Sequence, residues 1–195
     1  MKKIKVLVIG SGGHAKSCIE VIERVKKFKI IGLIDKKVNK RIGKYKVLFN
    51  DKDVKKIKKS STNLVLGIGS VNNLKKRNII FQRFKKLGFK FPKVISNNST
   101  VSKNTTIGEG TIVFNHVLIN TGSMIGKNCI INNKSLIEHD AIIEDHVHIS
   151  TCVTINGNCK IGQNSFIGSR AVLKNDITIK KDSFVKMGSI IKKNL

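Results

Sequence analysis

Residues 130–169 read IINNKSLIEHDAIIEDHVHISTCVTINGNCKIGQNSFIGS, with an aliphatic residue at every sixth position from Ile131. The same period runs unbroken through sixteen positions: Val101, Ile107, Val113, Ile119, Ile125, Ile131, Ile137, Ile143, Ile149, Ile155, Ile161, Ile167, Leu173, Ile179, Val185 and Ile191. A second register of small or apolar residues follows four positions after each. A six-residue period fits neither an α-helix nor an alternating strand. It fits coils of three short strands in which both registers point inward.

The repeat predicts a left-handed parallel β-helix over residues 98–195. Eighteen residues make one coil, so the sixteen hexads predict about five coils, with residues 18 apart stacked directly. Cys129 and Cys159 fall in the small inward register on different faces, Cys18 in a predicted helix, and Cys152 on the outside. We therefore expect free thiols rather than disulfides.

Residues 1–97 predict a separate, Rossmann-like βαβ domain. Three apolar runs predict parallel strands, at residues 3–10, 30–35 and 63–70, and two helices are expected, at about residues 16–27 and 71–87. The alternation of strands and helices favours a parallel sheet.

The first strand runs into a glycine loop. Gly10, Gly12 and Ala15 match the G-x-G-x-x-G/A turn, and Asp35 ends the second strand, where it can accept a hydrogen bond from a sugar or ribose hydroxyl. Backbone N–H groups of Gly12 and Gly13 at a helix N-terminus predict an anion site beside His14. A mononucleotide or nucleotide-sugar site, an NAD site and a purely structural turn all remain open, although three strands are few for a dinucleotide.

The charge lies mostly in the first half. Residues 1–97 carry 27 basic and 5 acidic side chains (net +22), and residues 98–195 carry 11 and 7 (net +4). Lysine supplies 33 of the 38 cations, whereas base readout favours arginine, so we expect no nucleic-acid partner. Compositional bias and attraction of anionic small molecules are the two remaining interpretations. Without an apolar run long enough for a membrane span or signal peptide, we expect a cytoplasmic protein.

Four histidines of the repeat lie between the inward registers and are expected to project outward. His116 and His146 are interpreted as surface residues. His139 differs because Gly157, 18 residues later, leaves a hole beside it in the stack, and because Asp140 or Glu138 can fix its tautomer. These neighbours make His139 a candidate general base.

The stretch quoted above, together with the N-terminal motif GSGGHAK (residues 10–16), resembles the hexapeptide-repeat acetyltransferases of bacterial sugars. The similar groups are the NeuD-like sialic acid O-acetyltransferases and the PglD-like acetyltransferases of UDP-4-amino sugars. The resemblance covers both domains and includes the E-H-D/E block followed nine residues later by H-[IV]-S. It implies an acetyl-CoA-dependent acyltransferase of surface-glycan biosynthesis, without a metal, that works as a homotrimer with active sites between subunits.

The resemblance also implies roles for individual residues. It assigns His139 as the general base and Asp140 as the acid that orients it. Four residues are implied as acetyl-CoA contacts: His148, Gly157, Ser169 and Met187. Six are implied as contacts of a nucleotide-sugar acceptor: Gly12, Gly13, His14, Asp35, Lys36 and Gly69. Independently of the resemblance, the 18-residue rule stacks Thr151, Ser169 and Met187 in one column where a pantetheine arm can lie.

Three alternatives stay open. We favour N-acetylation of a nucleotide-linked 4-amino-4,6-dideoxy sugar over O-acetylation of a sialic or related nonulosonic acid, because a carboxylate-backed histidine suits an amine that must lose a proton. A zinc site like that of γ-type carbonic anhydrases is disfavoured, because the histidine spacings differ from the pattern of that family. A non-catalytic binding module is the last alternative.

Overall fold

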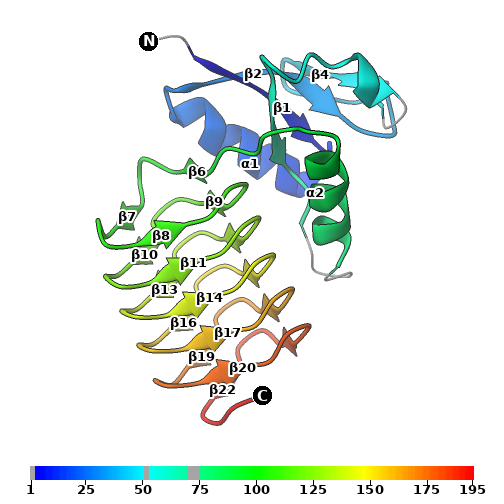
Figure 1. Ribbon diagram of the computed structural model, residues 1–195. Coiled ribbons are helices and arrows are strands. Elements are labelled where there is room, and N and C mark those ends of the chain that lie inside the picture. The colour runs from blue at the N-terminus through cyan, green and yellow to red at the C-terminus, as the bar shows by residue number, and fades with distance from the viewer. Residues whose placement is uncertain (1–2, 51–52, 70–74) are drawn as a thin grey trace.

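The computed structural model describes residues 3–50, 53–69 and 75–195 of the chain. A small α/β domain lies at one end of a three-sided prism, and the C-terminus lies at the other end (Figure 1). The two predicted fold types and their order along the chain are therefore confirmed.

The N-terminal domain is built on a five-stranded sheet in the order β3-β4-β2-β1-β5. Its strands are β1 (Ile4–Ile9), β2 (Phe28–Ile34), β3 (Arg41–Ile42), β4 (Tyr45–Phe49) and β5 (Asn63–Leu66). Pairing is parallel except between β3 and β4. The helical elements are α1 (Gly13–Arg24), the short 3₁₀ helix η1 (Asp53–Lys56) and α2 (Lys76–Lys86).

The three predicted strands are confirmed, and the sheet has two more. β3 and β4 escape the sequence pattern because their lysine-rich stretch forms a half-exposed edge whose apolar run, Val47–Phe49, is only three residues long. The helix predicted over residues 71–87 is confirmed from Lys76 onward, whereas residues 70–74 lie outside the described residues.

Alternate side chains of β1 enter two different cores. Val6 and Val8 pack with α1, and Leu7 and Ile9 pack with α2, which explains the uninterrupted apolar run of this strand. The core under α1 continues without a break onto the prism, where it includes Ile112, Phe114 and Ile130. The two domains therefore share a hydrophobic interface.

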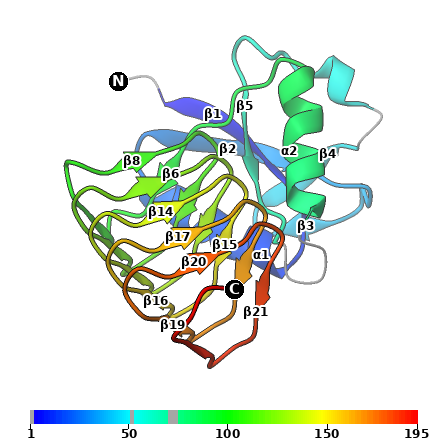
Figure 2. The ribbon, with the colours of Figure 1, turned by 60° about the horizontal axis from the view of Figure 1, so that its bottom comes forward.

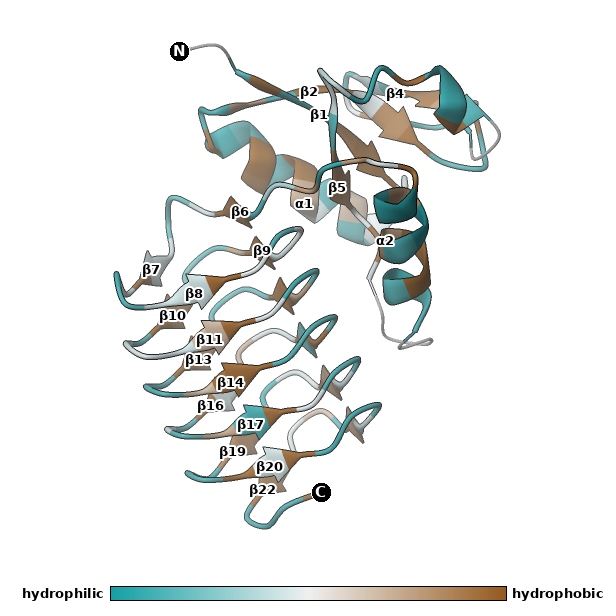
Figure 3. Ribbon diagram, viewed as in Figure 1, coloured by the Kyte–Doolittle hydropathy of each residue, from teal (hydrophilic) through white to brown (hydrophobic). Residues whose placement is uncertain are grey.

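Each wall of the prism is a stack of two-residue parallel strands, which Figure 3 shows as repeated hydrophobic segments. Face I contains β6 (Val94–Ile95), β9 (Ile112–Val113), β12 (Ile130–Ile131), β15 (His148–Ile149), β18 (Phe166–Ile167) and β21 (Phe184–Val185). Face II contains β7 (Thr100–Val101), β10 (Leu118–Ile119), β13 (Leu136–Ile137), β16 (Thr154–Ile155), β19 (Val172–Leu173) and β22 (Ile190–Ile191). Face III contains β8 (Thr106–Ile107), β11 (Met124–Ile125), β14 (Ile142–Ile143), β17 (Lys160–Ile161) and β20 (Thr178–Ile179).

Stacks of six, five and six strands make more than five coils, so the coil count differs slightly from the prediction. The difference arises because β6 opens the prism before the first aliphatic residue of the predicted repeat. Strands 18 residues apart pair in register, as expected. The four cysteines are free thiols, with Cys18, Cys129 and Cys159 buried, which confirms the prediction.

The small register is inside for a chemical reason as well as for its size. The buried hydroxyls of Thr111, Ser123 and Ser135 each donate to a main-chain carbonyl of the following turn, at 2.7–2.8 Å. Once per hexad the backbone turns with a positive φ, and eleven of these turn positions carry a residue other than glycine. The stacked hydrogen bonds of the coils hold these residues in a conformation that is normally unfavourable.

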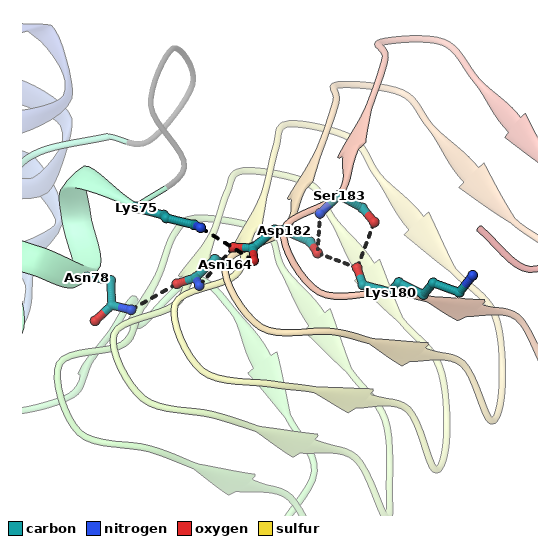
Figure 4. Close-up of polar contacts among 7 residues, drawn as sticks. Lys75, Asn78, Asn164, Lys180, Asp182 and Ser183 are labelled. Carbon is teal, nitrogen blue, oxygen red and sulfur yellow. Dashed lines mark hydrogen bonds and ion pairs between the residues drawn. The ribbon is translucent and has the colours of Figure 1, made fainter.

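Helix α2 packs along the corner between faces III and I (Figure 2). It meets a column of stacked turn residues there: the ring of Phe81 lies 5.6 Å from that of His146, and Asn78 Nδ2 donates to Asn164 Oδ1 at 3.0 Å. Lys75 reaches Asp182 in the next coil at 3.7 Å (Figure 4). The N-terminal domain is thereby fixed along three successive coils.

Candidate active site

His139 and Asp140 lie in the turn between β13 and β14, at the corner between faces II and III. Asp140 Oδ2 is 2.8 Å from His139 Nδ1, and both side chains are more than half exposed. Because a carboxylate accepts the hydrogen bond, Nδ1 carries the proton and the lone pair lies on Nε2. Glu138 instead accepts a hydrogen bond from Asn120 at 2.8 Å. Of the two acids considered for orienting His139, the structure therefore selects Asp140.

Two glycines make room for this dyad. A Cβ on Gly157 would stand 2.7 Å from both Cε1 and Nε2 of His139, so the imidazole lies directly over the glycine of the next coil. The predicted hole beside His139 is therefore filled by the ring itself. In the preceding coil, a Cβ on Gly122 would collide with Asp140 Oδ1. The 18-residue stacking rule relates Gly122 to Asp140, so the spacing that predicts Gly157 beneath His139 could also have identified this contact.

The histidines on face I and at its corner are buried, which corrects part of the prediction. His146 and His148 do leave the prism outward, but the N-terminal domain covers them, and they are 2% and 4% exposed. His146 is therefore not a surface residue, whereas His116 is exposed as expected. Burial lowers the pKa of His146 to about 4 and that of His148 to about 3.

His148 lies at the domain junction and does not contact the dyad within the chain. Its ring is 6.3 Å from that of His14 and 5.0 Å from that of Phe166. Both nitrogens of His148 and Nε2 of His14 are buried without a hydrogen-bond partner among the described residues. Burial, then the charge of Arg77, lowers the pKa of His14 to about 3, so both rings are neutral. Unpartnered buried nitrogens are costly unless a ligand or water satisfies them.

The predicted acceptor residues gather at the carboxyl edge of the parallel strands. Gly12 and Gly13 begin α1 in open space, and Gly69 lies beside the His14 ring. At the end of β2, Asp35 accepts hydrogen bonds from the Ser11 hydroxyl at 2.7 Å and the Lys37 amide at 3.0 Å. Partial burial opposes ionisation of Asp35, but these hydrogen bonds and the charge of Lys40 prevail and lower its pKa.

A cleft of about 510 Å³ opens at this edge. Its floor is apolar and its rim is cationic, with these residues in its lining: Ile9, Gly10, Ile34, Asp35, Lys36, Lys37, Lys40, Ile68, Lys76, Ile79, Ile80, Arg83 and Phe84. β1 lies between β2 and β5, so the strand order of the sheet reverses beside β1. Open α/β sheets bind ligands at the carboxyl ends of the strands where this reversal occurs. The surplus of lysine in this domain is thus partly concentrated around one acidic residue.

Two close contacts explain why the glycine loop has its sequence. A Cβ on Gly10, whose φ is +102°, would stand 2.9 Å from Ile68. A Cβ on Gly67 would stand 3.0 Å from that of Ala15, so helix and strand approach closely. Both contacts are those that the G-x-G-x-x-G/A turn requires.

Ser169 and Met187 lie at the corner between faces I and II, as the stacking rule predicts. Ser169 shares a 2.8 Å hydrogen bond with Ser150, and Met187 is 78% exposed. His139 lies at a different corner, across face II. A single chain therefore does not bring the candidate general base together with these two candidate acetyl-CoA contacts.

Arg77 is a residue whose importance the sequence did not reveal. It is 1% exposed, and it donates to the carbonyls of Leu66 and Ile68 at 2.7 Å and to that of Asn128 at 3.0 Å. It thereby connects β5 and the residues directly after it, 67–69, to the prism. No spacing rule separates this arginine from the exposed cations around it.

The fold and the site together define a class of protein: an acyltransferase built on a hexapeptide-repeat β-helix, with a Rossmann-like domain at its N-terminus. Residues 5–84 match the PglD N-terminal domain family, as the sequence resemblance implied. The family match covers the N-terminal domain, and the likeness to sugar acetyltransferases extends along the rest of the chain in the solved structures. Sequence comparison with curated proteins gives no match.

Solved structures agree along nearly the whole chain. The acetyltransferase domain of PglB from Neisseria gonorrhoeae FA1090 is 26% identical, with a TM-score of 0.93 over 99% of this chain and 93% of that chain. PerB from Caulobacter crescentus, solved with CoA and GDP-perosamine, is 26% identical, with a TM-score of 0.91 over 98% and 90%. WeeI from Acinetobacter baumannii AYE, at 23% identity and a TM-score of 0.88 over 97% and 92%, shares the fold.

Within residues 3–50, 53–69 and 75–195, no three histidine, cysteine, aspartate or glutamate side chains are grouped so as to hold a metal ion. No helix in that part of the chain is long and apolar enough to cross a membrane.

Proposed function

We propose that the protein transfers the acetyl group of acetyl-CoA to the amino group of a nucleotide-linked 4-amino-4,6-dideoxy sugar in bacterial surface-glycan biosynthesis. The observation that carries the proposal is the exposed His139–Asp140 dyad, whose Nε2 accepts no hydrogen bond within the described part of the chain. Likeness to PerB, which was solved with CoA and GDP-perosamine, supports an amino-sugar acceptor. Free cysteines fit the reducing cytoplasm, where we place the reaction.

The dyad suits general base catalysis. The acceptor nitrogen attacks the acetyl carbonyl carbon, the C–S bond breaks, and CoA leaves as the thiolate. His139 Nε2 accepts the proton that the nitrogen loses, while Asp140 holds Nδ1–H and stabilises the imidazolium. Cys129 and Cys159 are buried in the prism, and burial raises the pKa of both thiols, which disfavours a cysteine nucleophile.

The acceptor site of the proposal is the carboxyl edge of the N-terminal sheet. Amide groups of Gly12 and Gly13 and the lysines of the cleft, Lys36 among them, suit a diphosphate, and Asp35 suits a ribose or base donor. His14, Gly69 and His148 line the way from this loop to the prism, where the unpartnered imidazole nitrogens can receive polar groups of a substrate.

We propose a homotrimer, because one chain separates His139, with the proposed acetyl-CoA contact Gly157 beside it, from the acetyl-CoA contacts proposed at Ser169 and Met187. Exposed apolar side chains lie on both faces that meet at the His139 corner: Leu118 and Val172 on face II, and Met124 and Ile142 on face III. Burying them against neighbouring copies is favourable. Each active site then combines the dyad of one copy with the acetyl-CoA column of another.

His139→Ala tests the base. We expect it to abolish nearly all turnover in a thiol-release assay while acetyl-CoA binding by calorimetry persists, because the base is needed for proton transfer and not for affinity. The assay should use a panel of UDP-, dTDP-, GDP- and CMP-linked sugars with amine or hydroxyl acceptors. Turnover of hydroxyl acceptors alone would replace N-acetylation by O-acetylation, and substantial residual turnover of His139→Ala would refute the base.

The shared site has its own test. Light scattering should give three copies, and co-refolding inactive His139→Ala with an inactive variant of the Ser169 and Met187 column should restore part of the activity. Restoration requires that some sites receive both wild-type halves from different copies. Mixed trimers without any activity would place the complete site within one chain.

A further inference from the structure

We infer that Gly122 is a positioning residue for the reaction, because its missing side chain leaves the Asp140 carboxylate free to hold His139. The inference rests on the proposed function for its catalytic consequence. Its structural basis is the column of turn residues at the corner between faces II and III, in which Gly122, Asp140, Asn158 and Asp176 follow one another at intervals of 18.

At three turns elsewhere in the prism, an asparagine hydrogen bonds to the side chain stacked in the next coil. Asn158 Nδ2 donates to Asp176 Oδ1 at 2.8 Å, and Asn164 Nδ2 donates to Asp182 Oδ1 at 3.1 Å. Asn128 pairs with His146 at 2.9 Å in the same way. A side chain at one turn thus engages the polar group above it.

Gly122, directly beneath the dyad, has no side chain to form such a hydrogen bond. The glycine contributes no side chain, Asp140 Oδ1 occupies the space that a Cβ would take, and Asp140 Oδ2 bonds to His139 instead of to a stacked neighbour. An asparagine at this position would supply the same donor that Asn158 supplies to Asp176.

Backbone conformation does not account for this glycine. Gly122 has a φ of +73°, but eleven equivalent turn positions carry other residues, including Lys134, Cys152 and Arg170. Of the other glycines at these turns, Gly110 is explained by Phe81, which would stand 2.7 Å from a Cβ there. Gly188, with a φ of +70°, has open space where a Cβ would be. The feature that sets Gly122 apart is therefore Asp140.

The test is the substitution Gly122→Asn, with Asp140→Asn and the double variant. Asparagine tolerates positive φ well, so the fold should persist. We expect kcat to fall on the order of tenfold with little change in KM, because the dyad is misaligned while the binding residues stay in place. In the Asp140→Asn background the same change should cost nothing further. Wild-type kcat in Gly122→Asn, or a loss that multiplies fully in the double variant, would overturn the inference.

A spectroscopic readout separates this inference from the proposed function. In protein with ¹⁵N-labelled histidine, assigned with His139→Gln, we expect the Nδ1–H tautomer of His139 to dominate in the wild type and to lose dominance in Gly122→Asn. Gly188→Asn, the matched change at an open turn, should leave the His139 signals unchanged. An unchanged tautomer in Gly122→Asn refutes positioning, whether or not His139→Ala proves inactive.

Discussion

At the scale of single residues, two glycines of the prism show what one added methyl group would displace. At Gly157 the three atoms nearest to a Cβ would belong to side chains, two in the ring of His139 and one, at 3.2 Å, in the amide of Asn175. At Gly168 a Cβ would instead stand 2.5 Å from the main-chain nitrogen of Met187. A side chain can move aside, but the stacked backbone of the next coil cannot. Two glycines of one repeat thus have different reasons to be glycine.

We predict that Gly157→Ala lowers kcat on the order of tenfold with little loss of thermal stability, because the added methyl displaces the imidazole that acts as base. Gly168→Ala should instead lower the melting temperature, since it forces two coils apart. Calorimetric melting and steady-state kinetics of both variants check the pair. Equal losses of stability would contradict the distinction.

At the scale of elements, α2 determines how the N-terminal domain lies on the prism. Its Arg77 is fully buried with three carbonyl acceptors and no acidic partner among the described residues that it contacts. Burial lowers the pKa of this guanidinium to about 10, so it stays protonated at neutral pH. The helix therefore joins the two domains through one buried guanidinium, which donates hydrogen bonds to main-chain carbonyl groups of both domains.

We predict that Arg77→Met lowers the free energy of unfolding by about 3 kcal/mol, because it leaves three buried carbonyls without a donor. Arg77→Lys should recover only part of this loss, since an ammonium cannot reproduce the planar fork. Urea unfolding checks both values, with the exposed Gln82→Met on the same helix as the control. A loss no larger than that of the control would show that the carbonyls find other partners.

On the scale of the whole molecule, the domain junction makes stability depend on pH. Burial holds the pKa values of His14 and His148 at about 3 and that of His146 at about 4, whereas an unfolded histidine titrates near 6.5. Between these values the unfolded chain binds more protons than the folded one. Stability is therefore complete above about pH 6.5 and falls as the pH drops toward 4.

We predict a slope of at most about 1.4 kcal/mol per pH unit for each of the three histidines in this window. His146→Gln should make the slope shallower by up to that amount. Urea unfolding between pH 4.5 and 7.5 measures it, whereas His116→Gln, at an exposed turn, serves as the control. A flat profile over this range would show that the junction takes up protons without opening.

How much the sequence predicted differs between the two domains. The hexad period fixed the prism, its inward registers and the stacking of Thr151, Ser169 and Met187, because each coil contacts only its neighbours at a constant spacing of 18. The N-terminal strands followed from apolar runs, but the β3–β4 edge did not. His146 was interpreted as a surface residue, and the burial of His148 was not predicted, because the repeat states only that both side chains point away from the axis.

By itself, therefore, the sequence determined the architecture of each domain, the candidate dyad and the glycine loop, since these depend on local spacing and on periodic stacking. Tertiary structure alone decided what depends on contacts between distant segments: the burial of His148 against His14 and the role of Arg77. How the N-terminal domain lies over the prism is set by three-dimensional packing that no single period encodes.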